Sequence, residues 1–157
     1  MSIAMTEVIA TNRKTVILGM GATGLSVARF LSSLGESFVF ADTRNEPPRL
    51  QEVTDQYPGV KIVLGAFDSD LLVNFDRVIV SPGIALSEPA LVNAAELGIE
   101  LLGDLELFLE HAKAPVIAIT GSNGKSTVTT LVGQMANDSG LEVGVGGNLG
   151  TPMLDLL

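Results

Sequence analysis

Short apolar, β-branched runs alternate along the chain with longer stretches in which apolar residues recur every three or four positions. The short runs, typical of buried strands, are 14–18, 37–41, 61–64, 77–80, 99–102, 116–120 and 141–145. Helical spacing is found over 23–34, 49–56, 88–97, 104–111 and 125–139, with Asp104 expected to cap its helix. Strands that alternate with helices predict right-handed crossovers and a mostly parallel sheet, so the expected fold class is α/β.

Composition and charge narrow the class of protein. The chain has 157 residues, a formal net charge of −9, no cysteine and a single histidine. Such an acidic chain lacks the clustered lysine and arginine that nucleic acids require, and the absence of cysteine fits a reducing compartment. No apolar run reaches the ~20 residues that span a bilayer, and no signal peptide is recognised. We therefore expect a cytoplasmic protein with no nucleic-acid binding, no membrane insertion and no obligatory protein partner.

A glycine-rich turn follows the first predicted strand and opens the first predicted helix. Gly19, Gly21 and Gly24 fit G-x-G-x-x-G, in which backbone amides and the helix dipole bind a diphosphate. Asp42 ends the second predicted strand, where an acidic residue can bond ribose hydroxyls. The triplet 81–83 follows another strand and, taken alone, predicts a plain turn. The glycine turn therefore predicts a diphosphate ligand without choosing among NAD, FAD and a UDP-sugar.

A second glycine turn, TGSNGKST at 120–127, joins the predicted strand 116–120 to the last predicted helix. Gly124, Lys125 and Ser126 match the end of the P-loop pattern G-x-x-x-x-G-K-[ST], whereas Ile119 stands where its first glycine is expected. A lysine at a helix N-terminus is unfavourable unless a ligand with several negative charges lies there. ATP with Mg²⁺ is therefore the expected ligand, with Ser126 placed to bind the metal.

In their order and spacing these motifs resemble those of the Mur ligases. The matching stretches are 19–26, 42–44, 81–85, 103–108, 118–127 and 146–150. The resemblance is strongest to the members that join D-glutamate to UDP-N-acetylmuramoyl-L-alanine during peptidoglycan synthesis. It implies an ATP-dependent ligase in which a substrate carboxylate becomes an acyl phosphate, from which the amine of D-glutamate then displaces phosphate.

The resemblance also implies domains and residue roles. It implies a Rossmann-like, UDP-sugar-binding domain over 1–103, followed over 104–157 by the start of a P-loop ATPase-type α/β domain, incomplete and inactive alone. The implied UDP-substrate residues are Gly21, Ala22, Thr23, Asp42, Thr43, Arg44, Ser81, Pro82, Gly83 and Asn148. The implied ATP-binding residues are Gly121, Ser122, Asn123, Gly124, Lys125, Ser126 and Thr127. Among these, Lys125 would be the catalytic residue on the β- and γ-phosphates, and Ser126 would lie near Mg²⁺.

Two other functions stay open on the sequence. An NAD-dependent oxidoreductase would use the turn at 19–24 and Asp42, but it leaves the turn at 121–126 unexplained. A non-catalytic nucleotide-binding module would use both turns without turnover. Titration with a UDP-sugar, NADH and MgATP distinguishes the three.

Overall fold

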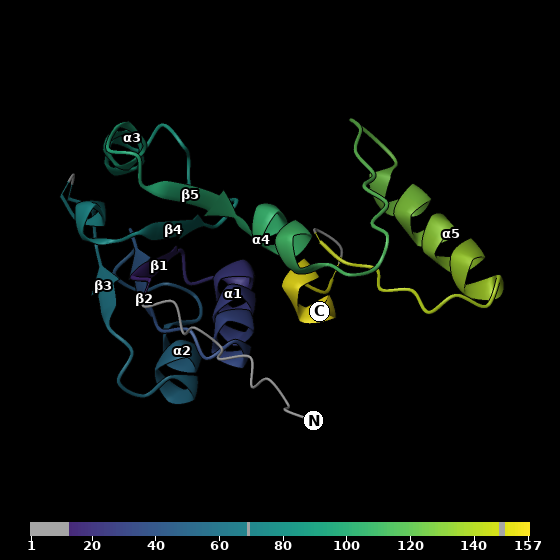
Figure 1. Ribbon diagram of the computed structural model, residues 1–157, viewed down its shortest axis with the longest axis horizontal. Coiled ribbons are helices and arrows are strands. Elements are labelled where there is room, and N and C mark those ends of the chain that lie inside the picture. The colour runs from purple at the N-terminus through teal and green to yellow at the C-terminus, as the bar shows by residue number, and fades with distance from the viewer. Residues whose placement is uncertain (1–12, 69, 148–149) are drawn as a thin grey trace, which may run out of the picture.

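The computed structural model describes residues 13–68, 70–147 and 150–157, and its elements follow the predicted alternation (Figure 1). The strands are β1 (Thr15–Leu18), β2 (Phe38–Asp42), β3 (Ile62–Leu64), β4 (Arg77–Val80) and β5 (Glu100–Gly103). The helices are α1 (Ala22–Ser33), α2 (Leu50–Gln56), α3 (Pro89–Glu96), α4 (Asp104–His111) and α5 (Lys125–Asp138), with short 3₁₀ helices η1 (Leu72–Asn74) and η2 (Met153–Leu156). None of the helices in these described ranges is long and apolar enough to cross a membrane.

The five strands form one sheet in the order β3-β2-β1-β4-β5, and every neighbouring pair is parallel. This confirms the predicted parallel α/β sheet. The chain runs outward from β1 to β3 and then returns to the other side of β1 with β4. The strand order therefore reverses between β1 and β4, which is where open parallel sheets bind ligands at their carboxyl ends.

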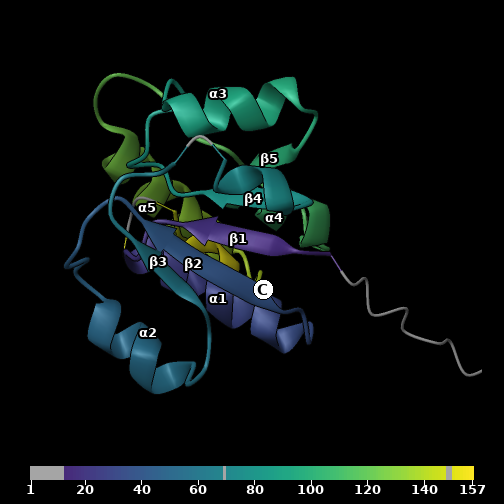
Figure 2. The ribbon, with the colours of Figure 1, turned by 90° about the vertical axis from the view of Figure 1, so that its left-hand side faces the viewer.

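Each face of the sheet carries its own hydrophobic cluster, because successive residues of a strand point to opposite sides. Ile17 of β1 joins a core cluster with Leu25 of α1, whereas the adjacent Val16 and Leu18 join a second cluster with Leu91 of α3. Figure 2 shows α1 and α3 on opposite sides of the strands. Each fully buried aliphatic side chain stabilises the fold by about 1.5–3 kcal/mol, so these two clusters supply most of the driving force.

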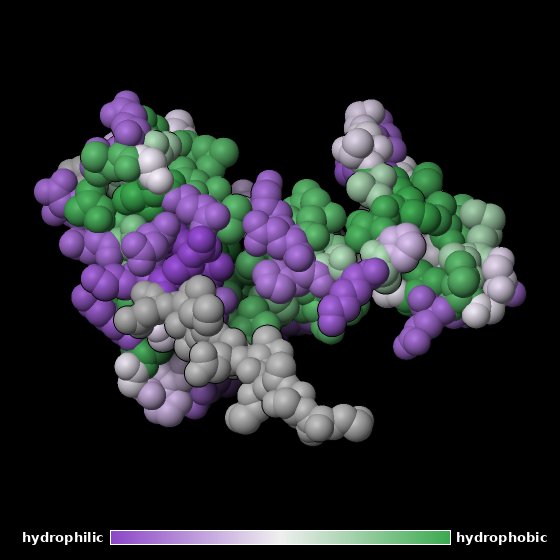
Figure 3. Space-filling view, viewed as in Figure 1, coloured by the Kyte–Doolittle hydropathy of each residue, from purple (hydrophilic) through white to green (hydrophobic). Residues whose placement is uncertain are grey.

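Two of the last described segments do not form the strands that the sequence predicts. Residues 116–120 and 141–145 have no strand assignment, so the predictions of strands there are wrong. A strand needs a hydrogen-bonded neighbour, and none of the described residues pairs with either segment. Ile117 is 72% exposed, and Leu131 and Met135 of α5 are 52% and 61% exposed. Figure 3 shows apolar side chains gathered over α5, which Figure 1 places apart from the sheet.

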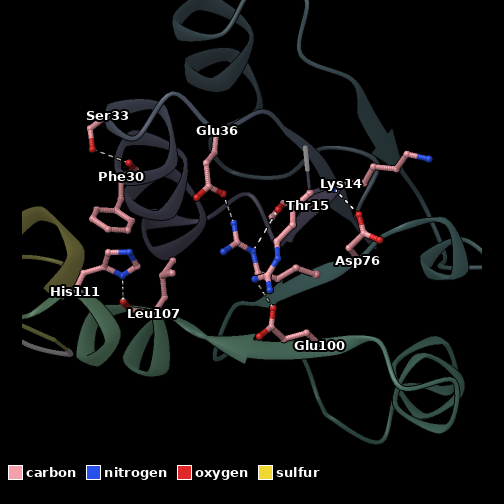
Figure 4. A network of polar contacts seen from close by, with 11 residues as sticks. Lys14, Thr15, Phe30, Ser33, Glu36, Asp76, Glu100, Leu107 and His111 are labelled. Carbon is pink, nitrogen blue, oxygen red and sulfur yellow. Dashed lines mark hydrogen bonds and ion pairs between the residues drawn. The ribbon is translucent and has the colours of Figure 1, made fainter. Parts of the chain in front are cut away.

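A polar network closes the amino edge of the sheet, opposite the carboxyl ends of the strands (Figure 4). The guanidinium of Arg77 in β4 forms an ion pair with Glu36 and donates through Nε to Thr15 Oγ1 at 3.3 Å. The amide of Lys14 donates to Asp76 Oδ2 at 2.8 Å. Because Arg77 is 5% exposed, its ion pair and hydrogen bond satisfy a charge that would otherwise be costly to bury.

Helix α4 and η2 pack against the same side of the sheet as α1. Leu107 of α4 and Leu154 of η2 belong to the first core cluster. The ring of His111 meets the ring of Phe30 edge-on, with centroids 4.8 Å apart. Figure 4 shows this pair beside the carbonyl of Leu107, which lies 2.9 Å from His111 Nδ1. Residues 104–111 and 153–156 therefore complete the burial of α1.

The start of α4 differs by one residue from the prediction. Asp104 is the first helical residue, and the cap is Gly103, so the expectation that Asp104 caps this helix is wrong. The Gly103 amide donates to Glu106 Oε2 at 2.9 Å. A glutamate three positions into a helix can satisfy the amide of the cap itself, which allows a residue without a side chain to occupy that position.

Candidate nucleotide-binding site

The first glycine turn is tightly folded between β1 and α1. Gly19 has φ of +95° and donates its amide to the Ala41 carbonyl at 2.8 Å, which ties the turn to β2. A Cβ built on Gly24 would lie 1.9 Å from the Gly19 carbonyl oxygen. Only glycine at 24 allows the helix to approach the turn this closely, as the G-x-G-x-x-G motif requires.

The N-terminus of α1 is open to a ligand. Gly21 occupies the cap position and has no side-chain cap, so the first amides of the helix have no side-chain acceptor. A Cβ built on Gly21 would meet nothing within 4 Å. Free amides, the positive end of a helix dipole and open space together suit the oxygen atoms of a phosphate.

Asp42 connects this turn to the loop after β2. Its Oδ2 accepts the amide of Met20 at 2.7 Å, and its Oδ1 accepts the amide of Arg44 at 3.0 Å. The Arg44 guanidinium donates to both carboxylate oxygens, at 2.8 Å from Nε and 2.7 Å from Nη2. Burial alone would raise the pKa of Asp42, yet the hydrogen bonds from Arg44 and Met20 outweigh burial and hold the pKa below its ordinary value. Asp42 is therefore an ionised carboxylate that fixes the turn and orients Arg44.

Replacing Asp42 with asparagine is expected to lower the free energy of unfolding at neutral pH by about 1–3 kcal/mol, because charge-assisted hydrogen bonds are lost. A carboxyl whose pKa is depressed in the folded state stabilises fully above its unfolded pKa. It loses that effect as the pH falls through its folded pKa. The stability gap between parent and Asp42→Asn should therefore shrink in acid. Urea unfolding at neutral and acidic pH measures the gap, and a gap that stays constant would contradict this role.

The loop after β4 lies directly beside the first glycine turn. A Cβ built on Gly19 would lie 2.8 Å from Ser81 Oγ, so the two loops are in close contact. The Ser81 amide donates to the Leu18 carbonyl at 3.1 Å, which continues the β1–β4 ladder into the loop. Pro82 and Gly83 are exposed, and a Cβ on Gly83 would meet nothing within 4 Å. The fold thus brings the triplet 81–83, a plain turn when taken alone, to the phosphate-binding turn.

An apolar cavity of about 670 Å³ is lined in part by Ser81. Its walls include Leu91 of α3 and Leu101 of β5, and Asp104 lies at its lining. Burial raises the pKa of Asp104 above its ordinary value. These walls are poorly suited to a diphosphate, which fits better at Gly21. Ser81 and Pro82 of the predicted triplet also line the cavity, whereas its apolar walls from α3 belong to no motif that the sequence offered.

The second glycine turn begins α5. Gly124, at the cap position, has φ of +71° and provides no side-chain cap. Lys125 Nζ donates across the turn to the Gly121 carbonyl at 2.5 Å. Residues 121–128 are all exposed. The turn therefore offers free amides and an ammonium group to an anionic ligand from solvent.

The predicted site residues fall into two groups in space. Residues 21–23, 42–44 and 81–83 gather at the carboxyl edge of β1, β2 and β4, whereas 121–127 lie at the start of α5. In Figure 1 the arrowheads of β4 and β5 point toward the side on which α5 lies, so the carboxyl edge faces that side. Asn148, the remaining predicted residue, lies outside the described residues.

Comparison with protein-family models decides the family. The model described as Mur ligase MurD-like, N-terminal domain, matches residues 13–103, which is more than half of the chain. The chain belongs to the MurD-like Mur ligases. The matched range ends at Gly103, the last residue of β5, and so contains the whole sheet of this MurD-like chain.

Curated relatives of this MurD-like chain are close in sequence and longer. The UDP-N-acetylmuramoylalanine--D-glutamate ligases of Pseudomonas putida and Marinobacter nauticus are 52% and 53% identical to it over 151 residues. Each alignment covers 96% of this chain but 34% of the relative. The chain thus spans about a third of the length of these curated relatives.

Solved structures agree with the fold. A pseudomurein peptide ligase type C from Methanothermus fervidus is 28% identical, with a TM-score of 0.53, over 83% of this chain and 27% of that one. The UDP-N-acetylmuramate-alanine ligase MurC of Thermotoga maritima is 24% identical, also with a TM-score of 0.53, over 80% of this chain and 29% of that one. The second likeness shows the fold alone.

The role of Asp42 in the MurD-like site is one that the motif did not indicate. The motif places an acidic residue beside a ribose, whereas this carboxylate is 2% exposed and bonded to Met20 and Arg44. An NAD-binding function would need that carboxylate for the ribose hydroxyls, so the arrangement does not favour the oxidoreductase alternative. The only advance signal was an arginine two positions after the aspartate, a spacing that suits a local ion pair.

Proposed function

We propose that this chain provides the nucleotide-binding part of an ATP-dependent ligase that joins D-glutamate to UDP-N-acetylmuramoyl-L-alanine. The observation that carries the proposal is the meeting of three loops at the strand reversal, around an open helix N-terminus at Gly21. A diphosphate and its attached uridine need such a surface, with amides for the phosphates and polar side chains beside them. The names of the curated relatives supply the identity of the proposed substrates.

The proposed residue roles follow from this placement. The diphosphate would bind the turn at 21–23, while Thr43 and Arg44 would surround the uridine, with Arg44 held in place by Asp42. The triplet 81–83 would close the same pocket. Asn148 is proposed to contact the UDP-substrate as well.

The second turn is proposed to bind ATP, through Gly121, Ser122, Asn123, Gly124, Lys125, Ser126 and Thr127. The left-handed cap at Gly124 and the uncapped amides of α5 fit a triphosphate. A hydroxyl that follows the P-loop lysine suits Mg²⁺, which prefers oxygen ligands, so Ser126 would hold the metal. When bound, Mg²⁺ would neutralise charge on the phosphates.

The proposed reaction has two steps. The carboxylate of UDP-N-acetylmuramoyl-L-alanine attacks the γ-phosphorus of ATP, ADP leaves and an acyl phosphate forms. The amine of D-glutamate then attacks the acyl carbon, inorganic phosphate leaves and the nitrogen loses a proton. Lys125 would act in the first step, because it offsets repulsion between the attacking carboxylate and the triphosphate.

The division of the chain and its compartment are part of the same proposal. We propose a UDP-substrate domain over 1–103 and the first part of the ATP-binding domain over 104–157, supported by the family match that ends at 103. A cytoplasmic setting fits a reaction that uses ATP and a soluble sugar nucleotide. Because the alignments cover 34% of the relatives, the complete reaction is proposed for the whole protein, and the 157-residue chain is not expected to ligate alone.

Isothermal titration of the 157-residue chain tests the proposal. UDP-N-acetylmuramoyl-L-alanine and MgATP are each expected to bind. NADH is not expected to bind, since the Asp42 carboxylate is already bonded to Met20 and Arg44 and is not available to the ribose hydroxyls. The two nucleotides should bind additively, because their turns are separate. Binding of NADH without any response to the UDP compound would contradict the proposal and restore the oxidoreductase alternative.

A further inference from the structure

A set of polar contacts joins η2 to the middle of α1. Ser26 Oγ donates to Asp155 Oδ1 at 2.9 Å. Arg29 donates from Nε to Oδ1 at 3.1 Å and from Nη2 to Oδ2 at 2.5 Å. We call Ser26, Arg29 and Asp155 the α1–η2 clasp. Since the partners are 126 and 129 positions apart in sequence, the clasp is a tertiary feature that no local motif requires.

Burial and paired hydrogen bonds hold the clasp in one geometry. Ser26 is 1% exposed, and Leu154, next to Asp155, is 4% exposed within the first core cluster. Burial alone would raise the pKa of Asp155, yet hydrogen bonds from Arg29 and Ser26 hold that pKa below its ordinary value. Two parallel bonds from a planar guanidinium fix orientation as well as distance, which a single bond does not.

Contacts continue from η2 to α5. The side chain of Leu156 packs closely against the backbone of Gly146, since a Cβ built on Gly146 would lie 2.7 Å from Leu156 Cδ1. Gly133 is the buried residue of α5, and a Cβ on it would lie 2.6 Å from Val145 Cγ2. A continuous series of contacts thus runs from α1 through η2 and the segment around Val145 to α5.

The two ends of this series carry the two proposed phosphate turns, since α1 begins after Gly21 and α5 begins after Gly124. We propose that Ser26, Arg29 and Asp155 are positioning residues, which fix α5 and its phosphate turn relative to α1 and its own. None of the three belongs to the proposed nucleotide-binding residues. The catalytic meaning of the clasp rests on the proposed function, whereas its geometry does not.

The placement matters because the proposed first step joins two substrates that are bound at different turns. The carboxylate belongs to the substrate whose diphosphate binds the first turn, and the phosphorus belongs to the triphosphate at the second. A misplacement of about 1 Å between reacting groups can lower a rate about 100-fold. In the full-length ligase, breaking the clasp should therefore lower kcat. The KM for each nucleotide should stay unchanged, since each turn remains intact.

Distance measurement tests the clasp directly. The chain has no cysteine, so spin labels can be attached at Glu96→Cys in α3 and Asn137→Cys in α5, both exposed. Double electron–electron resonance should give one narrow distance peak for the parent. Asp155→Asn and Arg29→Ala should each lose that peak to a broad distribution. The reversed pair, Arg29→Asp with Asp155→Arg, should restore it.

A matched control breaks an ion pair at the amino edge of the sheet. Arg13→Ala removes the exposed contact of Arg13 with Glu100 at 3.1 Å and should leave the narrow peak unchanged. Circular dichroism checks that the variants are folded. If Asp155→Asn is not folded, Arg29→Lys replaces it, because lysine keeps the positive charge but cannot make the two parallel hydrogen bonds of the guanidinium. A narrow, unshifted peak in the folded clasp variants would overturn the proposal. A parent that binds neither nucleotide would contradict the proposed function instead, since the distance measurement uses no nucleotide.

Discussion

Replacing Gly24 with alanine is expected to abolish the native first turn. The new Cβ would lie 1.9 Å from the Gly19 carbonyl oxygen, which is backbone and cannot move aside as a flexible side chain can. Overpacking a core typically costs about 1–3 kcal/mol, and a backbone clash costs more. Since domains are stable by about 5–15 kcal/mol in total, the loss should appear as a large fall in the urea midpoint of unfolding.

Gly21→Ala is the matched control, because a Cβ there would meet nothing within 4 Å and its φ is −104°. Stability should change little. Affinity for UDP-N-acetylmuramoyl-L-alanine should fall, since the methyl group would occupy the space proposed for the diphosphate. If Gly21→Ala binds the UDP compound as the parent does, the diphosphate does not lie at this turn. Equal stability of the Gly24 and Gly21 variants would contradict the close approach.

Replacing Lys125 with alanine should weaken MgATP binding by roughly 10- to 100-fold, the range expected when a hydrogen bond to a charged group is lost. The side chain is held over the turn by the Gly121 carbonyl, so its ammonium group is already close to where a phosphate would bind. Binding of UDP-N-acetylmuramoyl-L-alanine should survive, because the first turn lies on a different element. Calorimetric titration of each nucleotide measures both effects.

Lys61→Ala removes an exposed lysine just before β3, outside both turns, and serves as the control for loss of one positive charge. It should leave both affinities unchanged. Equal loss of the two ligands in Lys125→Ala would show that the two turns do not act as separate sites. If both lysine variants lose ATP binding, the effect of Lys125 comes from the net charge of the protein and not from a direct contact with the phosphates.

The centre of the sheet could be predicted from the sequence because β1 and β4 are buried on both faces. Val16 and Leu18 face one core and Ile17 the other, so the run that contains them is apolar throughout and easily recognised. The first glycine turn was predictable for a related reason. Gly19 and Gly24 satisfy steric requirements that no other residue meets, as the contact between them shows.

Long-range polar contacts were not predictable. Nothing near Arg29 in the sequence points to Asp155, and the pairing arises only once η2 folds back on α1. The predicted strands at 116–120 and 141–145 illustrate the converse limit. Their apolar patterns are those of strands, but strand formation depends on a hydrogen-bonded neighbour, which a pattern within one segment cannot reveal.

Leu154 bears on how this polypeptide assembles during synthesis. It fills a place in the cluster formed by Ile17, Leu25 and Leu31, more than a hundred positions earlier in the chain. A nascent chain that has emerged only as far as β5 already contains every strand of the sheet, yet it leaves a hydrophobic opening beside α1. The sheet is thus complete at residue 103, but the hydrophobic core beside α1 is complete only when Leu154 is in place. The family domain therefore ends before the segment that completes the core.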